Sequence, residues 1–201
     1  IFLFRNETDP LMFKVFIAGT TLTPYAHGLF EFELLFQECP NTMPKVRFCT
    51  TGASQVTFNA YLPASGLIDV SHIQPDSSSP KSEAPEHLNI TQLLLSLQSL
   101  FQTSRFLMGD EEKHWEKESE EGMREYKAYC NIIKYATIKH AMLEYLENPP
   151  VGLEDFICTY FCLKKDVILR ECKEWQAEAQ IDNGMYDNIA ARTNPELAAE
   201  L

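Results

Sequence analysis

The stretch Leu29–Phe36, with the sequence LFEFELLF, alternates apolar and acidic residues and indicates the fold class. Phe30, Phe32 and Leu34 alternate with Glu31 and Glu33, and this period of two residues is typical of a half-buried strand. Similar apolar runs lie at 11–17 and 45–48, and segments rich in proline, glycine and polar residues separate the three runs. Because parallel strands need long crossovers, these short connections predict an antiparallel meander.

Helical periodicity replaces this alternation in the second half of the chain. Apolar residues recur at three- and four-residue spacing over 90–101 and 122–146, and two further helices are predicted at 153–162 and 167–181. Strands followed by helices predict an α+β domain. We expect an antiparallel four-stranded meander with helices packed on one face, and extra helices at the C-terminal end.

The length of 201 residues is sufficient for one domain with a sizeable core. We expect this domain over 1–181, with a flexible proline- and serine-rich loop at 74–88 and a C-terminal tail at 182–201. The chain begins with Ile1 and enters strand-like sequence almost at once, so we expect it to be a piece of a longer polypeptide. No run approaches the roughly 18 apolar residues of a membrane span, and the expected location is cytoplasmic.

The net charge of −12 argues against nucleic acid as a partner, because phosphates require a basic surface. Acidic residues concentrate at 110–125, which predicts a solvated face or, alternatively, a docking site for a basic partner. Six cysteines in a chain without a signal peptide indicate free thiols. Cys158 and Cys162 lie one helical turn apart, but no histidine completes a tetrahedral set, so neither a metal nor a cofactor is predicted.

An ordered set of residues runs through the first hundred positions. It comprises Thr23-Pro24-Tyr25, Gly28, Phe30, Phe32, Phe36, Pro40, Pro44-Lys45-Val46-Arg47-Phe48, Phe58-Asn59, Gly66 and the segment LLLSLQSL at 93–100. This order resembles the ubiquitin-conjugating (UBC) fold family over about 11–101. The later segments AMLEYLENPP and CKEW look closest to the UBC domain of the giant inhibitor-of-apoptosis ubiquitin-conjugating proteins.

The resemblance also implies a site. In that family a cysteine accepts ubiquitin as a thioester, and an upstream His-Pro-Asn-type tripeptide supplies an asparagine that steadies the oxyanion. An ungapped alignment places Asn59-Ala60-Tyr61 on the tripeptide and Asp69 on the cysteine. Tyr61 would then replace the asparagine, and Asn59 is a weak stand-in for it. Because a carboxylate is a poor nucleophile for thioester exchange, the implied site is degenerate.

Other nucleophiles do not restore such a site. No cysteine lies between Cys49 and Cys130, so no local shift of the alignment supplies a thiol. Ser71 with His72 is the remaining pair, and it lacks both an orienting acid and the strand-to-helix turn of a serine hydrolase.

The resemblance therefore implies a catalytically inactive UBC-like domain that serves as a binding or scaffolding module in the ubiquitin pathway. The alternatives are an active ubiquitin or ubiquitin-like protein transferase and a purely architectural domain of a larger protein. The expected partners are ubiquitin or a ubiquitin-like protein and a ubiquitin ligase or another ubiquitin-conjugating enzyme. The N-terminal helix with which the family binds its activating enzyme is not present in this sequence.

Two surfaces are carried over from the family. The surface expected to meet a ligase or another partner comprises Pro40, Asn41, Thr42, Met43, Pro44, Ala60, Tyr61, Leu62 and Pro63. The surface expected to meet ubiquitin comprises Gln92, Leu95, Ser96 and Ser99 on the predicted helix.

Overall fold

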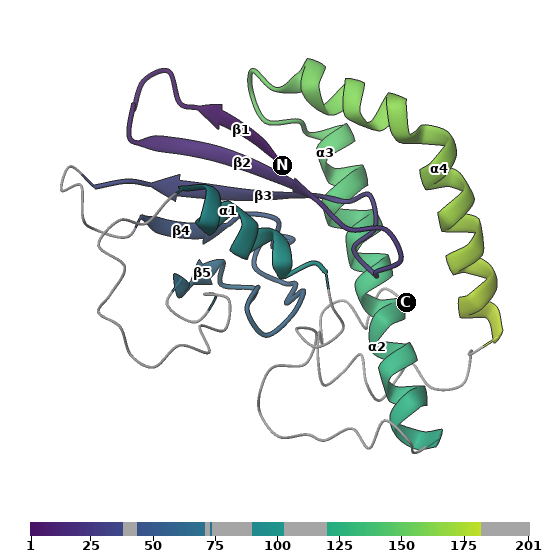
Figure 1. Cartoon of the computed structure of the whole chain (residues 1–201). Helices are drawn as coiled ribbons and strands as arrows, with labels where there is room; N and C mark the ends of the chain where they lie inside the picture. Colours follow the sequence, from purple (N-terminus) through teal and green to yellow (C-terminus); the bar gives the residue numbers. More distant parts are fainter. Residues whose placement is uncertain (38–43, 71–72, 74–89, 103–119, 182–201) are drawn as a thin grey trace.

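The computed structural model describes residues 1–37, 44–70, 73, 90–102 and 120–181. Five strands form one sheet in the order of the chain (Figure 1). They are β1 (Phe2–Arg5), β2 (Met12–Ala18), β3 (Leu29–Leu35), β4 (Lys45–Phe48) and β5 (Leu67–Ile68). Every neighbouring pair is antiparallel, which confirms the predicted meander, with five strands in place of the four expected.

The helices are α1 (Ile90–Ser99), α2 (Glu120–Ile138), α3 (Glu144–Glu147) and α4 (Glu154–Ile181). A π-helical turn, η3 (Lys139–Leu143), joins α2 to α3, so the long helix predicted at 122–146 is confirmed with a wider turn inside it. The prediction of separate helices at 153–162 and 167–181 is wrong. Neither glycine nor proline interrupts the residues between them, and lysine is a good helix former, so α4 continues.

The main core lies between one face of the sheet and the first two helices. The strand register aligns Val15 with Phe32 and Phe32 with Phe48, and all three side chains are fully buried. Leu97 of α1 and Ile133 of α2 belong to the same buried cluster. Because side chains alternate across a strand, this register fixes which residues reach the opposite face.

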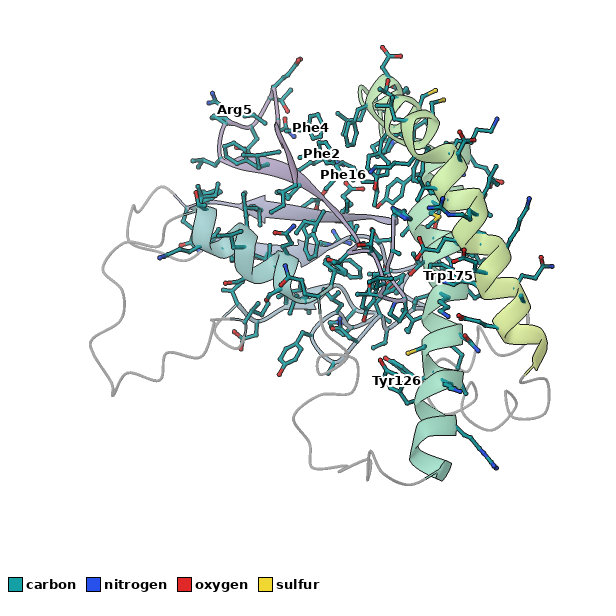
Figure 2. All side chains as sticks on the ribbon, turned by 45° about the vertical axis from the view of Figure 1, so that its right-hand side comes forward. Phe2, Phe4, Arg5, Phe16, Tyr126 and Trp175 are labelled. Atoms are coloured by element: carbon teal, nitrogen blue, oxygen red, sulfur yellow. The ribbon has the colours of Figure 1, made fainter. Side chains whose placement is uncertain are left out.

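Aromatic residues cover one end of that opposite face. Phe16 is aligned with Phe2 on β1, and its ring lies 5.5 Å from that of Phe156 at the start of α4. Phe2 and Phe4 each lie 4.9 Å from Phe156 (Figure 2). We call Phe2, Phe4, Phe16 and Phe156, with the adjacent Tyr160, the aromatic end cluster. The helices therefore pack on this end of the second face as well as on the predicted face.

A polar network lies beside the aromatic end cluster. The Lys14 ammonium is 2.7 Å from Oε1 of the buried Glu31, and the Tyr145 hydroxyl donates to Oε2 over 3.2 Å. The Tyr145 hydroxyl also lies 2.8 Å from Oγ1 of Thr50. A buried carboxylate requires such partners, so this network ties α3 to the sheet.

The remaining sequence predictions concern regions that the structure does not describe in full. The predicted loop at 74–88 and the tail at 182–201 lie outside the described residues. Within the described helices, none combines the length and the apolar character needed to cross a membrane.

Candidate functional site

The segment between β4 and the end of β5 holds the residues that the resemblance singles out. Its first part is a tight turn in which the Leu62 amide donates to the Asn59 carbonyl over 3.0 Å, and the Phe58 amide donates to the Leu62 carbonyl over 3.1 Å. Phe58 and Leu62 are fully buried, whereas Ala60 is exposed at the tip of the turn. The two buried side chains anchor the turn to the core.

Asn59 serves as the internal brace of this turn. Its side chain is 0% exposed, and its Nδ2 donates to the Tyr25 hydroxyl over 3.2 Å and to the Leu100 carbonyl over 3.3 Å. Its Oδ1 accepts the Tyr61 amide over 2.9 Å. Both amide protons are therefore directed to internal acceptors. This geometry disfavours Asn59 as the group that steadies an oxyanion at the surface.

Tyr61 lies one residue beyond the exposed tip. Its side chain is half-buried and packs against the main core, while Pro63 is half-buried further along the same segment. The backbone of Tyr61 is fixed by Asn59, so the two residues that flank Ala60 are held together. The structure thus closes 59–62 into one turn, with Pro63 directly after it.

Gly66 positions β5 against the end of β4. Its carbonyl accepts the Phe48 amide over 2.8 Å, and its φ of +71° lies in the left-handed region. A Cβ atom at this position would lie 2.4 Å from the Phe48 carbonyl oxygen. Only glycine fits this close approach. Asp69 follows β5 directly, and its side chain is exposed.

The other predicted surface residues divide into two groups. Pro44 is buried at the start of β4, and Pro40, Asn41, Thr42 and Met43 lie outside the described residues. The four positions predicted to meet ubiquitin follow the i, i+3, i+4, i+7 spacing of one helical face of α1. Gln92 is exposed and Leu95 is 55% exposed, whereas Ser96 and Ser99 are half-buried.

The cysteine thiols in the described part of the chain lie in different environments. Cys49 follows β4, and burial raises the pKa of its thiol to about 12, with the charges of Glu31 and Glu33 adding to the effect. The thiolate is the nucleophilic form, so Cys49 is poorly suited to thioester chemistry. Cys158 and Cys162 are exposed on α4 with their sulfur atoms 3.9 Å apart.

One group of side chains could in principle hold a metal. Ligand atoms of Glu31, Glu33 and Cys49 lie within 4.8 Å of one another. The Lys14 ammonium already occupies one oxygen of Glu31 at 2.7 Å. One of the two carboxylates in this group is therefore already paired with a side-chain cation.

A cavity between α2 and α4 was not anticipated from the sequence. It has a volume of about 530 Å³, and its walls come from α2, α4 and the loop at 22–24. These three segments are far apart in the chain, so neither spacing nor periodicity could have brought them together. The sequence did predict helices in both regions with apolar residues at helical spacing, and this pattern indicated that the helices pack but not that a cavity lies between them.

Comparisons with known proteins agree with this architecture. A family model described as ubiquitin-conjugating enzyme matches residues 3–133, which is well over half of the chain. The human dual E2 ubiquitin-conjugating enzyme/E3 ubiquitin-protein ligase BIRC6 is 33% identical over 182 residues, which cover 90% of this chain and 4% of that protein. The probable ubiquitin-conjugating enzyme protein 17 of Caenorhabditis elegans is 29% identical over 188 residues, which cover 93% of this chain and 25% of that protein.

A viral protein is also similar to this chain. The probable ubiquitin-conjugating enzyme E2 R521 of Acanthamoeba polyphaga mimivirus is 27% identical over 194 residues, which cover 92% of this chain. The matched region is 14% of that protein. The chain therefore spans a small part of the length of each of these three relatives.

Proposed function

The chain belongs to the ubiquitin-conjugating enzyme family, and on that premise we propose that it is a catalytically inactive member that binds or scaffolds other components of the ubiquitin pathway. The observation that carries this proposal is Asp69. It is exposed at the end of β5, at the position that the ungapped alignment assigns to the family's cysteine.

The chemistry of Asp69 supports a loss of ubiquitin transfer. A thioester forms when a thiolate sulfur attacks an activated carbonyl, and a thiolate is a strong nucleophile at neutral pH. A carboxylate in the same place is a weak nucleophile and would give an anhydride that water hydrolyses. Tyr61, at the position assigned to the asparagine, has a hydroxyl whose reach differs from that of an amide.

The environment of the nearest preceding cysteine also supports the proposal. Cys49 precedes Asp69 by twenty residues, and the raised pKa of its thiol keeps it protonated at neutral pH. Asn59, the remaining candidate for the oxyanion role, is used inside the fold. Within the described residues, neither Cys49 nor Asn59 is suited to replace the missing chemistry.

The proposed binding role uses the surfaces that remain exposed. The outward face of α1, with Gln92 and Leu95, would contact ubiquitin or a ubiquitin-like protein. The exposed Ala60 at the tip of the turn, with the half-buried Tyr61 and Pro63, would contact a ubiquitin ligase or another ubiquitin-conjugating enzyme. Leu95 is a large apolar side chain that is 55% exposed, which suits it to a protein contact.

A charging assay tests the loss of transfer. The chain is incubated with activating enzyme, ATP and ubiquitin, and a reductant-sensitive adduct is sought by gel electrophoresis. We expect no adduct with the natural sequence. A clear adduct that forms with the natural sequence and is lost on addition of a reductant would overturn the proposal and favour the active transferase.

A titration tests the binding role separately. Isotope-labelled ubiquitin is titrated with the chain and with the variant Leu95→Arg, and amide shifts are followed by NMR. We expect shifts that weaken with the variant, because a charge replaces an apolar contact. Binding of the natural chain and the variant with equal strength would exclude the α1 surface. An absence of shifts at millimolar concentration would favour an architectural domain.

A further inference from the structure

The cavity between α2 and α4 has the size and lining of a binding site. Its volume of about 530 Å³ falls within the range of roughly 300–1,000 Å³ that is typical of ligand pockets. The α2 wall presents Tyr126, Lys127, Cys130, Asn131 and Lys134, and the loop contributes Leu22, Thr23 and Pro24. None of these residues belongs to the segment around Asp69 or to α1.

The α4 wall combines an aromatic ring with three carboxylates. Glu171, Glu174 and Glu178 lie at i, i+3 and i+7, so they share one face of the helix with Trp175. The Trp175 side chain is 9% exposed and lies where α4 faces α2 (Figure 2). An indole face bordered by carboxylates is a favourable environment for a cation.

The ammonium group of Lys134 already lies beside the indole and a carboxylate of α4. The Lys134 ammonium lies 5.6 Å from the centroid of the Trp175 ring and forms an ion pair with Glu178. The contact shows that an alkylammonium group fits between the indole and a carboxylate of the same helix. Lys134 thus provides an internal example of the ligand chemistry that this wall accepts.

Two of the three carboxylates on the α4 wall already have a partner. Glu178 is paired with Lys134, and Oε2 of Glu171 lies 2.7 Å from Nε2 of the buried His27. Among the residues that the structure describes, Glu174 enters no ion pair, although it lines the same cavity. Glu174 is therefore the carboxylate to which an incoming cation would bind.

The loop side of the cavity provides an apolar rim. Leu22 is 99% exposed and has a φ of +65°, which is an uncommon conformation for a residue with a side chain. Pro24 lines the same cavity but is itself buried. Long basic side chains have aliphatic stems that cover apolar surface, so this rim suits the stem of an arginine.

We propose that this cavity binds an arginine side chain from a basic peptide segment of a partner protein. The guanidinium group pairs with Glu174 beside the Trp175 ring, and the aliphatic stem packs on the exposed Leu22. The net charge of −12 attracts a basic partner over a longer range. This inference goes beyond the proposed function, and a failure of the charging assay leaves it unaffected.

Trp175 provides the signal for a direct test. The chain contains two tryptophans, so the variant Trp115→Phe leaves Trp175 as the sole indole fluorophore. The test peptides are acetylated Gly-Arg-Gly amide and the matched peptide in which citrulline, a neutral isostere, replaces arginine. We expect saturable quenching or enhancement with the arginine peptide alone, and weaker binding at high salt.

Two substitutions make opposite changes to the wall. Glu174→Gln removes the unpaired carboxylate, and we expect it to weaken binding of the arginine peptide at least about threefold, as for other charge-assisted contacts. Lys134→Met removes the internal cation and frees Glu178, so we expect tighter binding. Glu147→Gln is the matched control, because Glu147 is an exposed glutamate outside the cavity lining, and we expect it to change nothing.

Several results would overturn the proposal. Equal responses to the arginine and citrulline peptides would show that the cation is not recognised. If Glu174→Gln and Glu147→Gln weakened peptide binding equally, the effect would come from the overall charge of the chain and not from Glu174. Weaker binding with Lys134→Met would indicate that the cavity prefers an anion, and no saturable response would exclude a site for arginine.

Discussion

Tyr25 and Asn59 meet inside the fold, where Nδ2 of Asn59 lies 3.2 Å from the Tyr25 hydroxyl, and the two side chains are 1% and 0% exposed. The Tyr25 hydroxyl in turn donates to the Phe58 carbonyl over 3.0 Å. Burial raises the pKa of Tyr25 well above its usual range, so the hydroxyl remains a donor. The turn that begins at Asn59 is therefore held from its buried side by Tyr25, which lies in the loop before β3.

Tyr25→Phe should destabilise the protein. The substitution leaves one amide proton of Asn59 without its acceptor, and an unsatisfied buried group costs about 1–3 kcal/mol. Urea denaturation would measure the free energy of unfolding. Tyr135→Phe is the control, because Tyr135 is half-buried and its hydroxyl makes no hydrogen bond within the described residues. Equal losses in the two variants would contradict the bracing role.

Gly66→Ala should cost more stability than Gly152→Ala. Both glycines have positive φ, +71° and +80°, so each substitution carries a backbone penalty of about 1–2 kcal/mol. At Gly66 the new Cβ would also meet the Phe48 carbonyl oxygen at 2.4 Å, whereas nothing lies within 4 Å at Gly152. Thermal unfolding of the two variants checks the difference. A larger loss at Gly152 would contradict the close approach of β4 and β5.

Cys49 should resist alkylation in the folded protein. Its pKa of about 12 lies well above the ordinary thiol value of about 8.5, so little thiolate is present at pH 8.5. The exposed Cys158 and Cys162 should react first with iodoacetamide, and mass spectrometry of peptides would give the order. Cys49 should react once urea unfolds the chain. Fast reaction of Cys49 in the folded protein would contradict its burial.

Asp69→Cys should introduce a reactive thiol beside β5. Because residue 69 is exposed, we expect the new cysteine to react with iodoacetamide much faster than Cys49 in the same molecule. The measurement is the modification rate of each peptide at pH 8.5. A thiol at 69 that reacts as slowly as Cys49 would show that this position is not accessible to a partner.

Alkaline pH should lower the free energy of unfolding. Burial raises the pKa of Cys49 and of Tyr160 to about 12, so both prefer to stay protonated in the folded state. A group whose pKa is raised by folding contributes fully to the free energy of unfolding at a pH below its unfolded pKa. This contribution is lost as the pH rises toward the pKa of the folded state. We therefore expect constant stability near pH 7–8 and a progressive loss above about pH 9.

Urea midpoints measured at pH 7.5, 9 and 10.5 would check this pH dependence. Cys49→Ala should give a shallower loss, because it removes one of the contributing groups. Stability that rises between pH 9 and 10.5 would contradict the burial of these groups.

The sequence supported the fold more fully than the site. The alternation in β3 and the periodicity of α1 are local patterns, so the meander and its first helix could be predicted. The continuation of α4 through Lys164, Lys165 and Asp166 was missed, because a polar stretch resembles a connection unless helix propensity is weighed. The turn at 59–63 could be located, but its internal bracing depends on Tyr25, which is far away in the chain.

The unbroken length of α4 connects two regions that were described separately. A helix of 28 residues is about 42 Å long. Phe156 in its first turn is held by β1 and β2, and Trp175 lies near its other end against α2. Figure 1 shows that α4 curves between these two supports. One continuous helix therefore packs against β1 and β2 near its start and against α2 near its end.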